Sequence, residues 1–143
     1  LVDSFEIKMK EKGIEITYEF GKNKSIFINA DNFRITQVMS NLIVNSLNYG
    51  VENGTTEIVT KNLSKEKILV RVIDNGQGIP EDDLPRIFER FYRVDKTRNR
   101  QEGGSGLGLA IVKHIVEAHN EIVYVESSLN VCSEFSFTLT KSN

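Results

Sequence analysis

A cluster of glycines stands directly before a long apolar stretch in the last third of the chain. Four glycines fall within six residues: Gly103, Gly104, Gly106 and Gly108. Apolar residues recur at helical spacing after them, which predicts a helix over Leu107–His119. The unpaired N–H groups and the dipole at such a helix start favour an anion. The segment is therefore either an anion-binding loop or a plain flexible linker in front of an amphipathic helix.

This glycine loop does not match the two best-known phosphate-binding patterns. No Gly-Lys-Ser/Thr follows the glycines, so the loop is not a Walker A loop. Leu109 stands where the third glycine of a G-x-G-x-x-G pattern would fall, and no strand directly precedes the loop. If the loop holds phosphates, it does so by another design.

A second group of polar side chains lies on the stretch Asp31–Tyr49, which has helical periodicity. Helical spacing places five of them in one stripe: Arg34, Gln37, Asn41, Asn45 and Asn48. Asparagine is a poor helix former, so three asparagines in one stripe indicate a site for neutral oxygen and amide groups. An amide oxygen is a suitable ligand for Mg²⁺. The alternative is a polar stripe that a neighbouring loop satisfies.

A third group begins where a predicted strand ends, at Asp74. A carboxylate in that position can accept a hydrogen bond from an exocyclic amine, which is worth roughly 1.5–3 kcal/mol. Gly76 and Gly78 follow, and they would let a flat ring lie against the backbone with no Cβ in the way. The alternative is a plain turn rich in Asp, Asn and Gly over Asp74–Pro80.

An aromatic segment, residues 87–93, precedes a basic stretch. Phe88 and Phe91 are most simply explained as core packing. Four cations follow: Arg93, Lys96, Arg98 and Arg100. The stretch Tyr92–Gly104 has little apolar content and is expected to be a mobile loop, so these cations either reach a polyphosphate or are merely solvated.

Periodicity also predicts the elements that must position these groups. Six stretches alternate like strands: Ile14–Phe20, Ser25–Asn29, Thr56–Asn62, Lys67–Ile73, Glu121–Glu126 and Glu134–Thr140. The first two are expected to form a hairpin. Helices are expected from the N-cap Asp31 to Tyr49, around Glu81–Phe88, and over Leu107–His119. The fold class is therefore α+β, with a largely antiparallel sheet and helices on one face.

Composition bounds the possible functions. The 143 residues are 39% hydrophobic and 27% charged, which is ordinary for one globular domain. A formal net charge of -2 gives no electrostatic case for nucleic acid. Cys132 is the only cysteine, so an internal disulfide is excluded. The chain starts at Leu1 rather than Met, so we expect it to be a fragment of a longer protein.

In this order, the four segments resemble the N, G1, F and G2 boxes of sensor histidine kinases. The resemblance covers about residues 31–119 and is weaker on either side. It implies the Bergerat ATP-binding fold of the gyrase, chaperone and histidine kinase superfamily. That fold is a two-layer α+β sandwich with a mixed, largely antiparallel sheet. ATP would lie between the Asn-rich helix and a lid.

The resemblance also implies roles for individual residues. Asn45 would be the Mg²⁺ ligand, with Asn41 one turn earlier near the phosphates. Asp74 would bind the adenine amine, and four residues would surround the ring: Tyr49, Gly76, Gly78 and Ile79. Five residues would wrap the phosphates: Gly104, Ser105, Gly106, Leu107 and Gly108. Arg93 would be a phosphate contact on the lid side.

One position separates branches of this superfamily. Hydrolytic members place a general-base glutamate one turn before the Mg²⁺ asparagine. Here that position is Asn41, whose amide cannot take a proton from water. Phosphate transfer to a histidine therefore fits better than a dedicated ATPase. That histidine is not visible, because the kinase H-box is absent and His114 and His119 read as packing or surface residues.

Some positions depart from the family pattern. Asn48 replaces a frequent lysine of the N box, and Asn120-Glu121 replaces a Gly-Gly pair after the last helix. Asparagine tolerates the left-handed conformation that a helix end often requires, whereas glutamate tolerates it less well. Asn130 and Cys132 replace glycines of the last turn. These changes bear on affinity and on that turn more than on the fold.

The chain is accordingly expected to be one catalytic ATP-binding domain over residues 1–143, a monomeric piece of a homodimeric sensor kinase. Its expected partners are the phosphoacceptor and dimerisation domain of the same protein and a response regulator, with no nucleic acid. We expect it to be the cytoplasmic part of a membrane-anchored protein. Two alternatives remain open: a nucleotide-binding pseudokinase scaffold and an anti-sigma-type serine protein kinase.

Overall fold

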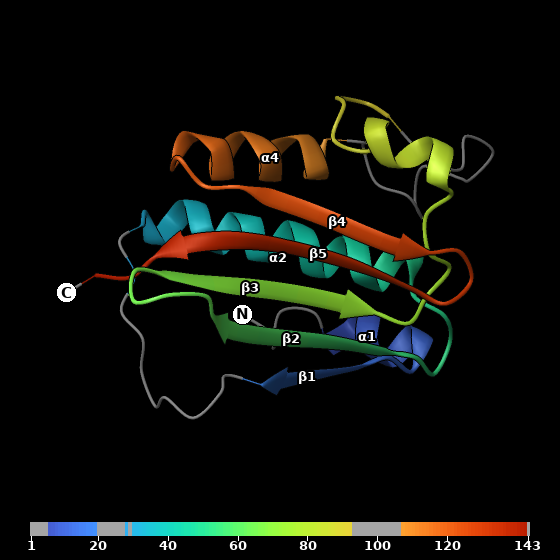
Figure 1. The fold of residues 1–143 in the computed structure, drawn as a ribbon. Coiled ribbons are helices and arrows are strands. Elements are labelled where there is room, and N and C mark those ends of the chain that lie inside the picture. The colour runs from blue at the N-terminus through green and yellow to red at the C-terminus, as the bar shows by residue number, and fades with distance from the viewer. Residues whose placement is uncertain (1–5, 20–27, 29, 93–106, 143) are drawn as a thin grey trace.

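One five-stranded sheet carries helices on one of its faces (Figure 1). The computed structural model describes residues 6–19, 28, 30–92 and 107–142. The strands are β1 (Glu15–Glu19), β2 (Thr55–Asn62), β3 (Lys67–Asp74), β4 (Val123–Ser128) and β5 (Cys132–Thr140). The helices are α1 (Glu6–Lys12), α2 (Asn32–Tyr49), the 3₁₀ helix η2 (Glu81–Arg86) and α4 (Gly108–Ala118). The expected α+β class, with helices on one face of the sheet, is confirmed.

The sheet is mixed but mostly antiparallel. Its strand order is β1-β2-β3-β5-β4, and only the pair β1–β2 is parallel. The expected hairpin after β1 is not seen in the part of the chain that the structure describes. β1 pairs with β2, and Ile28 forms an antiparallel bridge with Lys141. The alternating pattern identified β1 as a strand but carried no information about its partner.

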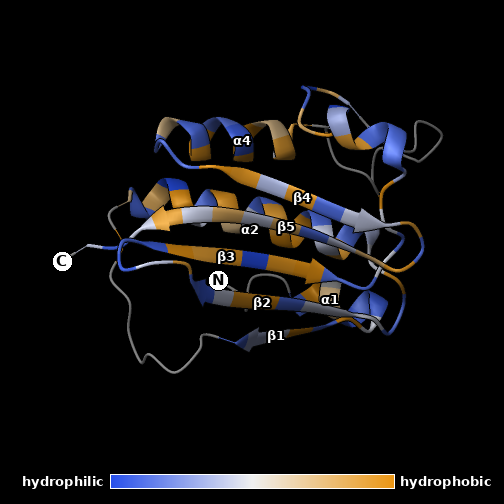
Figure 2. Cartoon of the chain, in the orientation of Figure 1, coloured by the Kyte–Doolittle hydropathy of each residue, from blue (hydrophilic) through white to orange (hydrophobic). Residues whose placement is uncertain are grey.

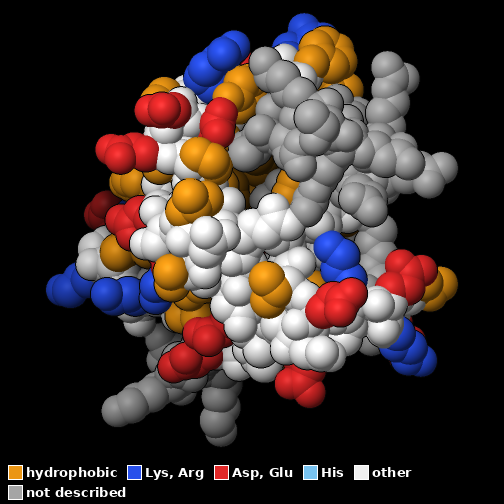
Figure 3. Space-filling view, turned by 90° about the vertical axis from the view of Figure 1, so that its right-hand side faces the viewer, with side chains coloured by type: hydrophobic (Ala, Val, Ile, Leu, Met, Phe, Trp, Pro, Cys, Tyr) orange, Lys and Arg blue, Asp and Glu red, His pale blue; other side chains and the backbone are white. Residues whose placement is uncertain are grey.

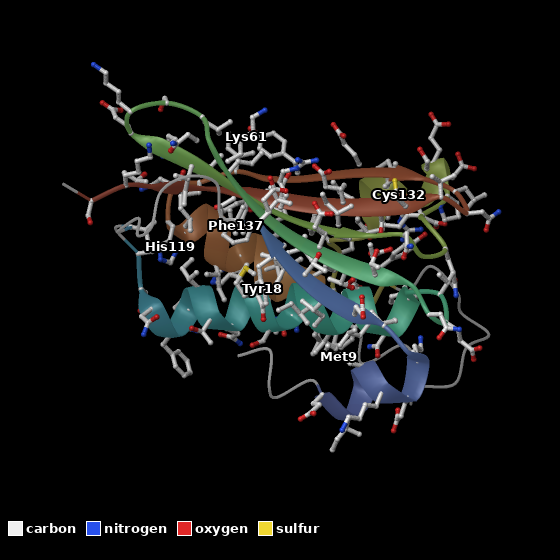
Figure 4. All side chains as sticks on the ribbon, turned by 90° about the horizontal axis from the view of Figure 1, so that it is seen from below. Met9, Tyr18, Lys61, His119, Cys132 and Phe137 are labelled. Carbon is white, nitrogen blue, oxygen red and sulfur yellow. The ribbon has the colours of Figure 1, made fainter. Side chains whose placement is uncertain are left out.

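The core lies between the sheet and the helices. Every second residue of β3 is buried, and β3 is hydrophobic over most of its length (Figure 2). In the register of β3 and β5, Val70 lies opposite Phe137 and Val72 opposite Phe135. Phe137 is fully buried and lies between the sheet and the helix layer, while Lys61 lies on the other face of the sheet (Figure 4). Burial of these alternating side chains fixes which face of each strand meets the helices.

Helix α2 begins and ends where the sequence predicts. The Asp31 carboxylate caps its first turn by accepting a hydrogen bond from Arg34 N (3.1 Å), and Gly50 follows its last residue. The apolar side of α2 buries Val38 and Leu42, whereas Asn41 on the other side is only half-buried. The expected division between an apolar and a polar side of this helix is confirmed.

Helix α4 packs against α2 and shares its core. Val112, Ile115 and Val116 of α4 belong to the same buried cluster as Val38 and Leu42 of α2. Aliphatic side chains from both helices thus form part of one core, and none of the ion pairs between described residues joins α2 to α4.

The chain turns from α4 into β4 through Asn120 and Glu121. Asn120 takes the left-handed conformation (φ 59°), as expected for asparagine after a helix. Glu121 is 7% exposed, and its carboxylate accepts hydrogen bonds from Lys67 Nζ (2.6 Å), Thr138 Oγ1 (2.8 Å) and Thr140 Oγ1 (2.7 Å). The glutamate in place of a glycine thus joins the end of α4 to β3 and β5.

No helix in the described ranges has the length and apolar character that crossing a membrane would require. The segment expected as a helix around Glu81–Phe88 is a shorter 3₁₀ helix with Pro85 inside it. Proline removes a backbone donor and does not continue an α-helix, which explains the short element.

Candidate functional site

Asp74 ends β3 and is 3% exposed, on the face that meets the helices. Its carboxylate accepts hydrogen bonds from the amide of Gly76 (2.9 Å) and from the hydroxyl of Ser133 (2.7 Å), and no cation pairs with it among the described residues. A carboxylate offers about four acceptor positions. Asp74 therefore keeps acceptor capacity for a further donor.

Burial sets the electrostatics of this carboxylate. Removal from water raises the pKa of Asp74 above its ordinary value, and the bonds from Ser133 and Gly76 only partly oppose this. A donor that arrived with a bound molecule would relieve the desolvation of the charged form. Buried carboxylates of this kind are typical of binding sites.

Gly76 brings the turn after β3 against the last turn of α2. A Cβ on Gly76 would lie 2.5 Å from Tyr49 O and 2.9 Å from Asp74 Oδ1, so no side chain fits there. The amide of Gln77 also donates to Tyr49 O (3.3 Å). The structure thus brings Asp74, Gly76 and the Tyr49 carbonyl together at one end of the molecule. Figure 3 looks onto this end, where a broad area of backbone and uncharged polar side chains occupies the middle.

Gly78 and Ile79 pack against the turn between β4 and β5. Gly78 has φ +71°, and a Cβ there would lie 2.4 Å from Ser128 O, so glycine is required. The amide of Ile79 donates to Ser127 Oγ (2.7 Å). The predicted adenine-side residues are therefore held by backbone contacts that fix the turn.

The last turn keeps its shape despite its two departures from the family pattern. Asn130 takes the left-handed conformation (φ 61°), and its backbone N–H donates a hydrogen bond to the backbone carbonyl of Gln77 (2.6 Å). Cys132 is half-buried, and its carbonyl accepts a hydrogen bond from Ser127 Oγ (2.9 Å). Asparagine is one of the few residues that adopt this conformation, so it substitutes for glycine here.

Asn41 and Asn45 occupy the polar side of α2, one turn apart, and both are half-buried. The side-chain amide of Asn41 donates to Gly108 O at the start of α4 (3.3 Å). The described residues contain no group of three or more His, Cys, Asp or Glu that could hold a metal ion. A site with one amide oxygen suits Mg²⁺ only when phosphates and water supply the other ligands.

The start of α4 faces this polar side of α2. Leu107 is the N-cap of α4 and makes no side-chain cap bond, and a Cβ on Gly108 would meet Asn41 Cβ at 3.9 Å, an ordinary van der Waals contact. The side chain of the N-cap residue therefore does not cap the first turn of α4. Four predicted phosphate contacts lie outside the described residues: Arg93, Gly104, Ser105 and Gly106.

The aromatic segment is only partly core. Phe88 packs edge-on against Phe135, with ring centroids 6.1 Å apart, as expected. Phe91 is 64% exposed and has φ 65°, so the prediction that it packs in the core is wrong. The turn that carries Tyr92 to the Asp83 carboxylate points Phe91 outward, where its ring lies under the Arg90 guanidinium.

Two residues that the sequence does not single out contact this site. Ser133 lies directly opposite Asp74 in the sheet and donates to its carboxylate. Thr56 lies opposite Asp74 on the other side, and its hydroxyl bonds the buried Ser46 hydroxyl of α2 (2.6 Å). Strand register brings both to Asp74, and a single sequence does not show register. The Asn48 side chain is uncharged where the family pattern often has a lysine. Its backbone carbonyl, near the end of α2, accepts a hydrogen bond from Lys12 Nζ (2.7 Å).

This chain is similar in sequence to known proteins. A family model described as the histidine kinase-, DNA gyrase B- and HSP90-like ATPases matches residues 30–143. The sensor histidine kinase WalK of Bacillus subtilis (strain 168) is 39% identical over 140 residues, 97% of this chain and 23% of that protein. The chain therefore spans less than a quarter of the length of this relative.

Solved structures of histidine kinases share the fold. The nucleotide-free catalytic domain of histidine kinase ThkA matches with a TM-score of 0.81 and 31% identity, over 97% of this chain and 86% of that one. Histidine kinase ThkA in complex with the response regulator TrrA matches with a TM-score of 0.77 and 28% identity, over 98% and 38% of the two chains.

Proposed function

This chain belongs to the histidine kinase-, DNA gyrase B- and HSP90-like ATPases, as the ATP-binding catalytic domain of a sensor histidine kinase, and we propose that its nucleotide site is the Asp74 end of the sheet. There it would hold Mg²⁺-ATP and present the γ-phosphate to a histidine of a separate phosphoacceptor domain. Residues 1–143 would then be a single catalytic domain without the dimerisation helices.

The observation that carries the proposal is the buried carboxylate of Asp74. It retains acceptor capacity, pairs with no cation among the described residues, and lies beside a backbone where Gly76 leaves no room for a Cβ. The adenine amine is a donor of the right kind, and the flat ring would lie against Gly76, Gly78 and Ile79. A charge-assisted hydrogen bond of this type contributes roughly 1.5–3 kcal/mol.

The phosphates would extend from the Asp74 end toward the start of α4. Asn45 would supply an amide oxygen to Mg²⁺, which, when bound with ATP, neutralises charge on the phosphates. Gly108 and Leu107 would place the backbone of the α4 start beside the phosphates, with Asn41 between the two helices. Arg93, Gly104, Ser105 and Gly106 would complete the phosphate contacts.

Transfer rather than hydrolysis follows from the amide at Asn41. An amide does not act as a general base, so this chain offers no group there to activate water. What the chain contributes is position: it would orient the γ-phosphate and stabilise its charge. The attacking imidazole would come from the phosphoacceptor domain.

Partners follow from the relatives. ThkA has been solved with its response regulator TrrA, and the catalytic domain in that complex has the fold of this chain. We infer that the full protein of this chain is a homodimer that relays phosphate to a response regulator. Its catalytic domain would then lie in the cytoplasm.

Calorimetric titration of the chain with ATP, ADP and GTP, each with and without Mg²⁺, tests the nucleotide site. The proposal expects adenine nucleotides to bind selectively and ATP binding to depend on Mg²⁺. Asn45→Ala should remove most of the Mg²⁺ dependence and leave the adenine preference. Equal binding of GTP and ATP would contradict the assignment of Asp74.

Phosphate transfer is tested separately by adding the phosphoacceptor domain of the full protein in trans. Labelled phosphate should appear on a histidine of that domain, in an acid-labile form. Nucleotide binding without any transfer would favour a pseudokinase scaffold. Acid-stable phosphate on a serine would favour a protein serine kinase of the same superfamily.

A further inference from the structure

His119 directly follows the last residue of α4, and its side chain contacts the N-terminal end of α2. It is half-buried, and Figure 4 shows it beside the first turn of α2. The ring nitrogen Nε2 lies 3.2 Å from the backbone amide of Asp31, the N-cap of α2. Nδ1 lies 2.8 Å from Ile115 O, one turn earlier in α4.

The two contacts define how the imidazole is used. The amide of Asp31 is a donor, so Nε2 accepts, and Ile115 O is an acceptor, so Nδ1 carries the proton. Both ring nitrogens are therefore hydrogen-bonded. His119 is half-buried, which agrees with a packing or surface residue, and it also bonds a second helix.

A second polar bond joins the same two helices at the other end of their interface. Asn41 Nδ2 donates to Gly108 O at the start of α4 (3.3 Å). Asp31 and Asn41 are about 15 Å apart along α2, and Gly108 and His119 about 16 Å apart along α4, at 1.5 Å per residue. The start of α2 bonds the end of α4, and Asn41, further along α2, bonds the start of α4. The helices therefore run antiparallel, with one polar bond at each end of their interface.

The two helices also share an aliphatic core. Val38 and Leu42 of α2 pack with Val112, Ile115 and Val116 of α4. Aliphatic packing has no directional bonds of its own, although its shape favours one arrangement. The directional bonds at the two ends add to this packing in setting the position of α4.

We propose that His119 is a positioning residue for the nucleotide site. Its hydrogen bond to Asp31 holds α4 in one position along α2 and thereby places Gly108 against Asn41. The proposal rests on the proposed function, because the site that it tunes is the predicted phosphate site. Without the bond, α4 samples displaced positions as well as the position seen in the structure. The apparent dissociation constant for ATP then rises by the inverse of the fraction of molecules in which α4 has that position.

Two substitutions of His119 separate the two bonds. His119→Asn keeps a donor near the Nδ1 position for Ile115 O but does not reach Asp31. His119→Gln places an acceptor near the Nε2 position and retains the bond to Asp31. The exposed His114 on the same helix supplies the matched control, His114→Asn.

The first readout is the ATP affinity of the 143-residue chain by calorimetry. His119→Asn should weaken ATP binding roughly threefold to tenfold, the effect that one ordinary hydrogen bond allows. His119→Gln and His114→Asn should stay within about twofold of the wild type on the same scale. The proposal is overturned if His119→Asn binds ATP like the wild type, or if His119→Gln loses as much affinity as His119→Asn.

The second readout needs no nucleotide and keeps the proposal separate from the proposed function. Hydrogen exchange of the Ile111 amide, which bonds Leu107 O in the first turn of α4 (3.0 Å), reports how well that end of the helix is seated. His119→Asn should speed this exchange roughly threefold to tenfold, and His119→Gln should not. A wild type that binds no ATP would refute the nucleotide site, and the exchange comparison would still decide the role of His119.

Discussion

Two buried carboxylates lie at opposite ends of the same sheet and are treated differently. Asp74 ends β3 and receives hydrogen bonds from neutral donors, the Ser133 hydroxyl and the Gly76 amide. Glu121 lies beside the start of β3, and its carboxylate accepts hydrogen bonds from the Lys67 ammonium group and from two threonine hydroxyls. Lys67 and Asp74, at the two ends of β3, are seven residue steps apart, or about 23 Å along the strand.

The pKa shifts follow this difference. Burial raises the pKa of Asp74, and its neutral donors do not reverse the shift. Burial also acts to raise the pKa of Glu121, but the bonds from Lys67, Thr140 and Thr138 outweigh it and the pKa lies below its ordinary value. A buried carboxylate whose charge is satisfied internally holds the fold together, whereas one whose charge is left short of partners is ready for a ligand.

The largest expected effect is on stability at the Glu121 end. Lys67→Met leaves the Glu121 carboxylate buried without its cation, and we expect a loss of about 2–3 kcal/mol in the free energy of unfolding. This lies below the roughly 3–5 kcal/mol of a fully buried pair, because the Lys67 side chain is 38% exposed. Chemical denaturation measures the loss.

The exposed Lys61 on β2 provides the matched control for this prediction. Lys61→Met should change stability by less than about 0.5 kcal/mol. ATP affinity should be unchanged in both variants. Equal stability losses for Lys67→Met and Lys61→Met would remove the distinction between the two ends.

A smaller effect is expected from the glycines of the Asp74 end. Gly78→Ala puts a Cβ against Ser128 O in a left-handed backbone, so we expect a loss of about 2 kcal/mol in stability. At the other end Asn120 already occupies the left-handed region, so Asn120→Gly should change stability by only a few tenths of a kcal/mol (about 0.3). Thermal unfolding of the two variants compares them, and similar shifts would contradict the account.

Much of the fold could be predicted from the sequence, because periodicity and capping are local properties. The N-cap Asp31 and the stop at Gly50 fixed α2 to the residue, and alternation located all four strands after it. The partner of β1 could not be predicted, since strand pairing depends on residues far apart in the chain. The outward turn of Phe91 was missed for a similar reason: it depends on a contact between Tyr92 and Asp83.

The candidate site could be proposed from the sequence because its four segments occur in the order that the family shows. Asp74 and Gly76 alone would also suit a plain turn, and their role in binding stays a prediction. Ser133 was not predictable, since only strand register places it opposite Asp74. Glu121 was read as a poor helix end, and the three donors that pair with its carboxylate come from β3 and β5.

The pH dependence of stability should have opposite signs for the two carboxylates. With its raised pKa, the contribution of Asp74 to stability is fully present below the unfolded pKa of about 3.9 and is lost as pH rises through the folded value. With its lowered pKa, the contribution of Glu121 is present above the unfolded pKa of about 4.3 and is lost as pH falls through the folded value.

Asp74→Asn and Glu121→Gln remove these contributions one at a time. Relative to Asp74→Asn, the wild type should lose stability as the pH rises from about 3 to about 7. Relative to Glu121→Gln, the wild type should gain stability over the same range. Denaturation at several pH values gives both difference curves, and curves of the same sign would refute the pKa assignments.

The smallest effect is expected at Gly108. A Cβ there would make only ordinary contact with Asn41 at 3.9 Å, so Gly108→Ala should raise the free energy of unfolding by about 0.4–1 kcal/mol, through a lower entropy of the unfolded chain. The same methyl group should weaken ATP binding if phosphates approach the start of α4. A variant with higher stability and unchanged affinity would move the phosphates away from Gly108.

The most direct test of the contrast between the two carboxylates is the ATP affinity of Asp74→Asn beside that of Glu121→Gln, measured by calorimetry in Mg²⁺. We expect Asp74→Asn to lose roughly 1.5–3 kcal/mol of binding free energy, the scale of a charge-assisted hydrogen bond. Glu121→Gln should bind within about twofold of the wild type, because its carboxylate serves the fold alone. Wild-type affinity in Asp74→Asn, or an equal loss in Glu121→Gln, would contradict the assignment of the Asp74 end as the nucleotide site.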